Sequence, residues 1–350
     1  MGKYTTKTSG SHCCDPGCFR LILRNIYQQN ETESISVKPV GPSVLFGEGA
    51  HWDASAQALF FVSTLGDTIH KYTPLTETHT SAELNGIPTF IIPIEGHPQH
   101  YVVGLDDRVV EIQWSGFPDS TAKEVNTVVA KGTVEKDQKR YDKGKADPRG
   151  RVFVGAMPID IDIDETSRNG SLYRIDADGS LHQVISAVDM TNGLSWDVKE
   201  MAFYFADSFQ NKIWRYDYDI DTGDISNPRS VFELSEHGLA GIVDAMTIDI
   251  DGNLWVANFD GYQVLKIDPR RNQLLQKVSV PGRQITSCTF GGPNSDILYM
   301  TSIAKNKQGP QPPPHGSLYA ITGLGVKGYT NVSAKINMKL VAKLDDDDKF

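Results

Sequence analysis

The sequence predicts an all-β fold, a six-bladed β-propeller with a metal site at its centre, from three observations. A unit of two short strands recurs six times, and no helical periodicity lies between the copies. The first strands of the units begin at residues 58, 100, 151, 202, 253 and 297, which gives spacings of 42 to 51 residues. Propeller blades repeat in this range. Hairpin signals such as Asp178-Gly179 and Asp251-Gly252 separate strands.

Each unit is expected to hold a buried strand, a turn and a strand of alternating polarity. The six units are Ala58–Val62 with Thr68–Tyr72, His100–Gly104 with Arg108–Ile112, Arg151–Gly155 with Gly170–Asp176, Ala202–Ala206 with Lys212–Tyr216, Asn253–Ala257 with Gln263–Asp268, and Ile297–Thr301 with Gly316–Ile321. Two stacked β-sandwiches are the alternative fold. Sandwich strands do not recur at one regular period, so the pattern favours a ring.

The repeats divide the chain into three parts. Residues 1–40 precede the first repeat and are expected to be a flexible N-terminal extension. Residues 41–342 form the propeller, and residues 343–350 form an acidic tail that takes no part in the fold. We therefore predict one folded domain with a tail at either end.

Charge and cysteine content exclude several classes of protein. The net charge is −10 and Lys and Arg form no cluster, which argues against nucleic acid as a partner. No apolar stretch approaches the length of a membrane span. Three of the four cysteines (Cys13, Cys14 and Cys18) crowd into the first twenty residues, which does not fit a secreted disulfide scaffold. We expect a cytoplasmic protein that is a monomer or a weak dimer.

Four polar stretches stand immediately before predicted blade strands, where side chains can reach the axial channel. They are Phe46–Trp52, Arg140–Arg151, Met190–Trp196 and Gly241–Asp249. Glu48, Asn192 and Asp244 offer two carboxylates and one amide carbonyl, a set of hard oxygen ligands that suits one divalent cation. Ca²⁺ is the first expectation, with Mg²⁺, Mn²⁺ and Zn²⁺ as alternatives. A lone acidic residue before a strand more often caps a turn, so the prediction depends on the recurrence at equivalent places.

These segments resemble the family of regucalcin (senescence marker protein), gluconolactonase and luciferin-regenerating enzyme. The resemblance runs from about Gly47 to Gly328. It rests on Gly47-Glu48-Gly49-x-x-Trp52, Lys145-x-Asp147-Pro148-x-Gly150-Arg151, Asn192-Gly193-Leu194-x-Trp196, Asp244-x-Met246, Gly252-x-Leu254-Trp255-Val256-Ala257 and Ile321-Thr322-Gly323-Leu324-Gly325-Val326-Lys327-Gly328.

The resemblance implies roles for individual residues. Glu48, Asn192 and Asp244 would hold the metal, and Asp244 would also be the general base. Arg140 and Asp142 fall where the family contacts its substrate, and Asp160 falls on a further acidic contact of some members. The sequence departs from the family in four places: Asp142 replaces Asn, Lys143 replaces Asp, Ala50 replaces Pro and Ala245 replaces Gly.

These residues predict a metal-dependent hydrolase that opens a lactone or similar cyclic ester. One alternative is a calcium-binding regulatory protein with weak or lost lactonase activity, although three protein ligands are few for tight calcium binding. Another is a propeller that serves only as an interaction platform. Burying a carboxylate cluster without its cation is costly, which argues against that alternative.

Overall fold

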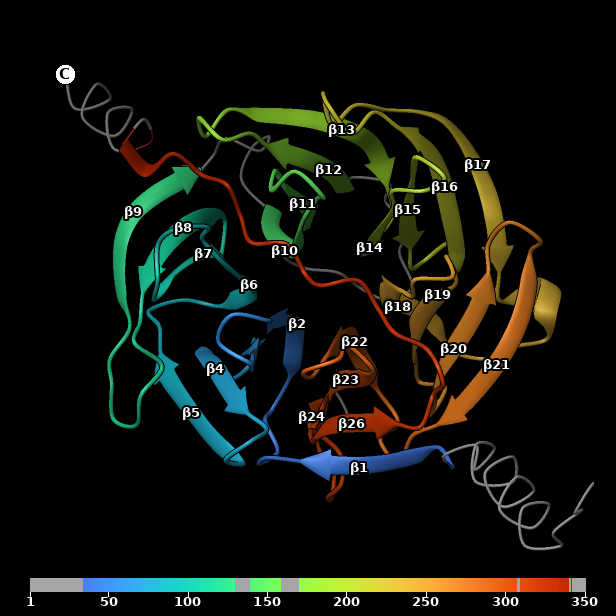
Figure 1. Cartoon of the computed structure of the whole chain (residues 1–350), viewed down its shortest axis with the longest axis horizontal. Coiled ribbons are helices and arrows are strands. Elements are labelled where there is room, and N and C mark those ends of the chain that lie inside the picture. The colour runs from blue at the N-terminus through green and yellow to red at the C-terminus, as the bar shows by residue number, and fades with distance from the viewer. Residues whose placement is uncertain (1–33, 130–138, 159–169, 307–308, 340, 342–350) are drawn as a thin grey trace, which may run out of the picture. The chain divides into compact units, whose positions relative to one another are not determined.

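The computed structural model describes residues 34–129, 139–158, 170–306, 309–339 and 341. All of these except Ser34 belong to one unit of the chain, Ile35–Phe350. This unit contains six four-stranded antiparallel sheets arranged around an axis, as Figure 1 shows. The predicted six-bladed propeller is therefore confirmed. The predicted acidic tail and most of the predicted N-terminal extension lie outside the described residues.

The first five blades each consist of four consecutive strands, numbered from the axis outward. Their strands are β2 (Gly47–Asp53), β3 (Ala58–Ser63), β4 (Thr68–Thr73) and β5 (Thr78–Glu83); β6 (Pro88–Pro93), β7 (His100–Leu105), β8 (Arg108–Gln113) and β9 (Lys123–Val129); β10 (Lys139–Ala146), β11 (Val152–Pro158), β12 (Gly170–Ile175) and β13 (Leu181–Val188); β14 (Thr191–Asp197), β15 (Ala202–Asp207), β16 (Lys212–Tyr218) and β17 (Ile225–Glu233); and β18 (Ile242–Ile248), β19 (Leu254–Phe259), β20 (Gln263–Asp268) and β21 (Gln273–Ser279).

The sixth blade takes its strands from both ends of the chain. Its three inner strands are β22 (Ile285–Gly291), β23 (Ile297–Ser302) and β26 (Leu318–Thr322), and its outermost strand is β1 (Ser36–Val40). β1 pairs antiparallel with β26, so that Val37 lies opposite Ile321. The expected domain boundary at residue 41 is therefore wrong by one strand. Without β1 the sheet would end in an unpaired β26, whose backbone groups would be left open to other chains.

Two shorter strands, β24 (Lys305–Asn306) and β25 (Gly309–Pro310), form a small hairpin between β23 and β26. A single turn of 3₁₀ helix, Ser235–His237, follows β17. Among the described residues no helix is long and apolar enough to cross a membrane.

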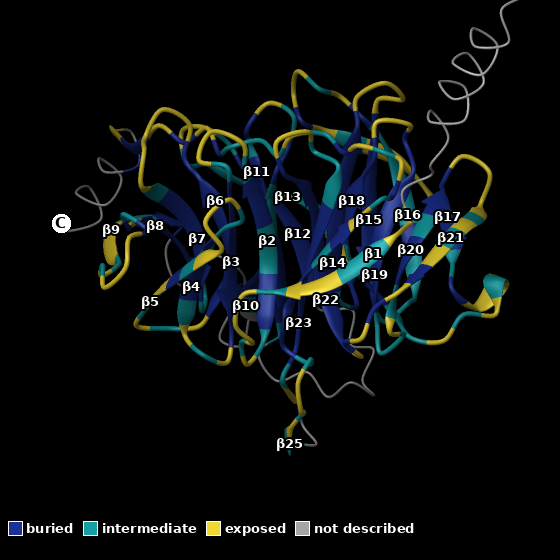
Figure 2. Ribbon diagram, turned by 60° about the horizontal axis from the view of Figure 1, so that its bottom comes forward, coloured by how far each residue is buried: buried dark blue, intermediate teal, exposed yellow. Residues whose placement is uncertain are grey.

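Hydrophobic side chains are buried mainly between blades. Six clusters of buried side chains each join two neighbouring blades and together go round the ring. In the contact between the first and sixth blades, Trp52 stacks on Tyr299 with ring centroids 5.5 Å apart. The second strands are buried along all or nearly all of their length because both of their faces meet other blades; β3, for example, is buried at every residue. Figure 2 shows this dark buried interior, with exposed residues at the loops and outer edges.

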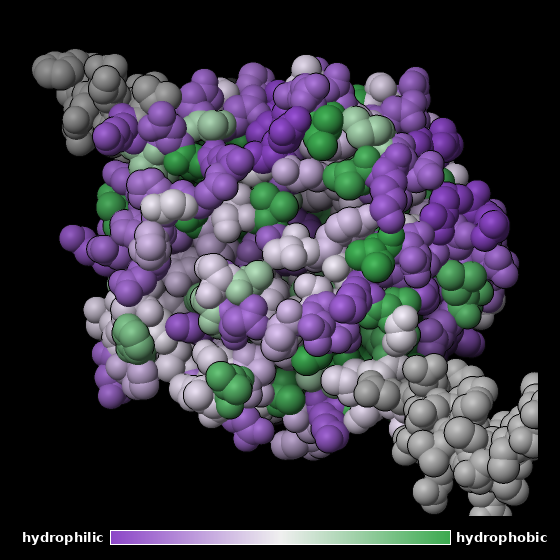
Figure 3. Space-filling model, viewed as in Figure 1, coloured by the Kyte–Doolittle hydropathy of each residue, from purple (hydrophilic) through white to green (hydrophobic). Residues whose placement is uncertain are grey.

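A segment that follows β26, Leu324–Val341, crosses one end of the ring and is called the strap below (Figure 1). Its Gly328 bridges to Asp249 and its Ala334 to Ile94, which directly follow the inner strands β18 and β6. Ala334, Ile336 and Met338 are buried against the second and third blades. In Figure 3, which views the same face, hydrophobic side chains are scattered among hydrophilic ones. The strap thus closes the end of the axis at which the inner strands finish.

Candidate functional site

A bulge in every inner strand shapes the centre of the propeller, which we call the hub. Each inner strand has one residue more than the neighbouring strand at the point where the pairing shifts. Bulges of this kind redirect side chains. The four bulges that matter here lie between the pairs Glu48/His51, Tyr141/Gly144, Thr191/Leu194 and Val243/Met246. Asp142, Asn192 and Asp244 are each the first residue inside a bulge, and Glu48 is the paired residue that borders one.

Close packing of the blades brings these bulges together. Gly193 follows Asn192, and a Cβ atom at Gly193 would lie 2.8 Å from the backbone oxygen of Asp244. Real Cβ atoms do not approach oxygen so closely, so glycine is needed at this position. The fourth and fifth blades thus pack the backbone that follows Asn192 against the backbone of Asp244.

The side chain of Lys143 lies between the two predicted carboxylate ligands. Its Nζ donates to Glu48 Oε1 and lies 3.3 Å from Asp244 Oδ1. Glu48, Lys143 and Asp244 are all buried, with 5%, 8% and 6% of their surfaces exposed. We refer to these three residues as the ionised cluster, after the ammonium of Lys143 at its centre. Sequence analysis noted Lys143 only as a departure from the family; the bulge beside Asp142 is what carries its side chain into the hub.

Burial and charge act in opposite directions within the ionised cluster. Burial lowers the pKa of Lys143, but the carboxylates of Asp244 and Glu48 outweigh this effect and raise it above its usual value. Burial raises the pKa of Glu48 and of Asp244, and the Lys143 ammonium opposes both shifts. The contact between the three groups therefore favours the charged form of the lysine.

Asn192, the third predicted ligand, is buried and its Oδ1 has no hydrogen-bond partner in the described part of the chain. A carboxamide oxygen in this state can accept a bond from a cation or from a donor on a substrate. The structure therefore brings all three predicted ligands to the hub, with one acceptor still free.

The residues as arranged do not fit a divalent cation. Calcium and magnesium need oxygen ligands about 2.0–2.6 Å from the ion. The point between Glu48 and Asp244 from which an ion would reach both carboxylates is taken by the ammonium of Lys143. Over the residues that the structure describes, no group of three or more His, Cys, Asp or Glu side chains could hold a metal.

The predicted substrate residues have different outcomes. Arg140 lies on β10, opposite Met157, and its Nε is buried without a hydrogen-bond partner among the described residues. Asp142 is buried, and its charge contributes to the raised pKa values of Glu48 and Asp244, for which burial is the main cause. Asp142 thus faces the hub rather than solvent. Asp160 lies outside the described residues.

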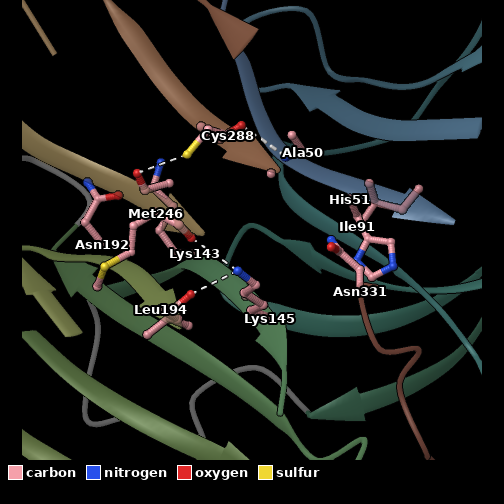
Figure 4. Close-up of a pocket in the computed structure, with 15 residues that line it drawn as sticks. Ala50, His51, Ile91, Lys143, Lys145, Asn192, Leu194, Met246, Cys288 and Asn331 are labelled. Atoms are coloured by element: carbon pink, nitrogen blue, oxygen red, sulfur yellow. Dashed lines mark hydrogen bonds between the residues drawn. The ribbon is translucent and has the colours of Figure 1, made fainter. Parts of the chain in front are cut away.

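A small cavity of about 40 Å³ lies between the ionised cluster and the strap (Figure 4). Lys143 and Asn192 line it together with side chains that the sequence analysis did not assign to the site. Lys145 Nζ donates to the backbone oxygens of Leu194 (3.1 Å) and Met246 (3.2 Å), and burial lowers its pKa to about 8. Cys288 donates to the backbone oxygen of Trp255 at 3.2 Å, and burial raises its pKa to about 12.

Two further polar residues, His51 and Asn331, line this cavity. Burial lowers the pKa of His51 to about 4, which keeps the ring neutral. Asn331 comes from the strap, and its Oδ1 accepts a bond from Thr289 at 3.0 Å. A cavity of this size holds one or two water molecules. The cavity is therefore too small to admit a sugar-sized molecule.

The chain was compared with known proteins. Residues 46–304 match the model of the SMP-30/gluconolactonase/LRE-like region. Regucalcin from Danio rerio is 34% identical over 289 residues, which cover 81% of this chain and 92% of the relative. The chain belongs to the SMP-30/gluconolactonase family. The resemblance inferred from the sequence motifs is thereby confirmed.

Solved structures agree with this membership. A luciferin-regenerating enzyme superposes with a TM-score of 0.82 at 35% identity, covering 86% of this chain and 100% of the other. A protein from Agrobacterium tumefaciens, described as regucalcin and as calcium-binding, has a TM-score of 0.69 at 21% identity and covers 83% and 94% of the two chains. At that identity the second comparison supports the fold alone. The relatives include proteins named as enzymes and proteins named for calcium. Family membership therefore does not decide between these two functions for this chain, and the residues at the hub have to be considered.

Proposed function

We propose that this chain is a hydrolase that opens a lactone or a similar cyclic ester at the propeller hub. Membership of the SMP-30/gluconolactonase family supports a lactonase-type activity. The observation that carries the proposal is the ionised cluster, a buried arrangement of two carboxylates around one cation at the centre of the ring. A buried charge cluster is costly for a fold and is typical of a site that performs chemistry.

In this proposal Asp244 is the general base. Its Oδ1 accepts a hydrogen bond from the backbone N–H of Ala245 (2.8 Å) and faces Lys143, which leaves Oδ2 to accept a proton from water. An ammonium group has three N–H donors, and two of them face Glu48 and Asp244. The third, together with Arg140, would stabilise the negative charge on the carbonyl oxygen during ring opening. Asp142, Asn192 and residues beyond the described ones, such as Asp160, would contact the substrate.

The sequence also predicts a water activated by a metal that Glu48, Asn192 and Asp244 hold. Because Lys143 occupies the space between the carboxylates, no step of the mechanism above is assigned to a metal. The metal-dependent form of the proposal requires a state in which Lys143 has left the cluster.

The test is hydrolysis of a panel of sugar lactones and other cyclic esters, each with chelator and with added Ca²⁺, Mg²⁺, Mn²⁺ or Zn²⁺. Asp244→Asn should lower kcat about 10²–10⁴-fold, because it removes the base without changing shape. The control is Glu83→Gln, which changes an exposed carboxylate at the end of β5 and should leave kcat unchanged. Near-normal turnover by Asp244→Asn, with an unaltered melting temperature, would contradict the role of Asp244.

A second candidate is a calcium-binding protein with little or no turnover. The free carboxamide oxygen of Asn192 favours it, because such an oxygen suits calcium. Calorimetric titration with Ca²⁺ separates the candidates. Tight binding together with failure to turn over the whole panel would favour the second.

A further inference from the structure

Two lysines on β10, two residues apart, have different surroundings at the hub. The Nζ of Lys145 donates to two neutral backbone oxygens, and burial lowers the pKa of this lysine to about 8. The Nζ of Lys143 instead contacts the carboxylates of Glu48 and Asp244. The same strand thus holds one lysine in a neutral surrounding and one in an anionic surrounding.

The anionic surrounding is one that a cation must fill. Glu48 and Asp244 come from different blades, yet both face a single point, and Asp142 adds a third buried carboxylate nearby. Unpaired carboxylates in such a place would destabilise the fold strongly. Lys143 supplies the positive charge from within the chain, at the extra residue of the β10 bulge.

A divalent ion and the ammonium cannot occupy this point together. Within about 4 Å, two positive charges in a buried site repel each other by several kcal/mol even when the surroundings are polar. Metal binding would therefore require Lys143 to leave both carboxylates. Its side chain would then have to carry its charge to another place in a hub whose walls are buried.

We propose that Lys143 is a resident cation that takes the place of the divalent metal at the hub. The wild-type chain consequently binds divalent cations weakly. If the chain is the hydrolase proposed above, it also hydrolyses its substrate in the presence of chelator. Only this last statement rests on the proposed function.

The test compares wild-type protein with Lys143→Met and Lys145→Met. Purified proteins are stripped with chelator, and binding of Ca²⁺, Mn²⁺ and Zn²⁺ is measured by calorimetry and by the rise in melting temperature. Lys143→Met leaves the carboxylates free, so it should bind at least one of these ions about a hundredfold more tightly than the wild type. It should also melt at a lower temperature without metal and recover when metal is added.

Lys145→Met is the matched control. It removes a buried lysine from the same strand that contacts no carboxylate among the described residues, so its metal affinity should equal that of the wild type. Equal metal affinity of all three proteins would overturn the proposal. An equal gain by both variants would also overturn it, because the effect would then be general loss of positive charge.

The wild-type measurement keeps the proposal testable even if Lys143→Met does not fold. Stoichiometric metal in the purified wild-type protein, or binding at micromolar concentration with Lys143 intact, would contradict it. The proposed function fails separately. If turnover requires added metal, the proposal that Lys143 replaces the metal is wrong, but the chain is still a hydrolase. If the chain shows no turnover and binds metal weakly, the proposed function is wrong, but the role of Lys143 stands.

Discussion

At the scale of single residues, the histidine pair of the first blade links burial to pH. His70 and His79 lie on adjacent strands, and their rings stack with a hydrogen bond of 3.0 Å between Nδ1 of His70 and Nε2 of His79. Phe61 stacks on His70 at a centroid distance of 4.8 Å. Burial and the neighbouring ring lower the pKa of His70 to about 3, and burial lowers that of His79. The pair is therefore neutral in the folded protein.

This pair predicts that acid destabilises the fold well above the pH at which carboxylates are protonated. An unfolded histidine takes a proton near pH 6.5, whereas folded His70 does so only near pH 3. In this window the unfolded state binds more protons. The contribution of His70 to the free energy of unfolding is thus highest above pH 6.5 and falls as the pH drops, by about 1.4 kcal/mol per pH unit. We expect the free energy of unfolding, measured in urea, to fall between pH 7 and pH 5 in the wild type. For His70→Asn this fall should be smaller by about 2 kcal/mol.

The control for this experiment is His97→Asn, since His97 is exposed on a loop. It should keep the wild-type dependence on pH. If His70→Asn also kept it, the acid sensitivity would have to come from other groups.

Residues also show where sequence reasoning reached its limit at the hub. Glu48, Asn192 and Asp244 could be predicted because each follows a short apolar lead at the same place in its repeat. The role of Lys143 could not, because its long side chain reaches a different blade and only the assembled ring shows which carboxylates it meets. The one signal in the sequence was its replacement of an acidic residue of the family.

At the scale of elements, the second and third strands of each blade were predictable and the first and last were not. The expected starts at 58, 100, 202 and 297 coincide with those of β3, β7, β15 and β23. These strands are long apolar runs because they pack between blades. The inner strands contain bulges, polar residues and glycine, which weaken any simple alternation. The sequence of β1 is typical of a loop because it contains Lys38 and Pro39. Both residues are tolerated in the structure because β1 is an edge strand.

The closing strand gives a prediction at this scale. A chain that begins at residue 42 lacks β1, so it should be less stable than one that begins at residue 34, by about 2–4 kcal/mol. The loss comes from the pairing with β26 and from the packing of Val37 against the cluster between the fifth and sixth blades. Urea unfolding measures this loss of stability. A peptide of residues 34–41 added in excess should restore part of the lost stability. Equal stability of the two chains would mean that β1 does not help to close the ring.

At the scale of the whole molecule, the sixth blade is the one in which strands from the two ends of the chain pair, whereas every other blade is continuous in sequence. A covalent link across this pair should therefore act on the entire propeller. Lys38 lies opposite Ala320, and both side chains are at least partly exposed. A disulfide between cysteines at these two positions would enclose nearly the whole propeller in one loop.

We expect Lys38→Cys with Ala320→Cys to stabilise the oxidised protein by about 2–4 kcal/mol. The matched control is Gln263→Cys with Ser279→Cys, which links two strands of the fifth blade and encloses only one hairpin. The first link should raise the melting temperature more, because it constrains a much longer loop in the unfolded chain. A larger effect of the hairpin link would show that the ring does not open at β1 during unfolding.

The way in which β1 completes the sixth blade has a consequence for the newly made chain. A ribosome releases β1 first, and its partner β26 is made only after the other five blades. Throughout synthesis the strand exists without its neighbour, among growing sheets whose outer edges are open. The charge of Lys38 and the missing N–H of Pro39 make it a poor partner for those edges. Lys38 and Pro39, which make β1 difficult to predict from the sequence, thus also disfavour its pairing with other strands before β26 is made.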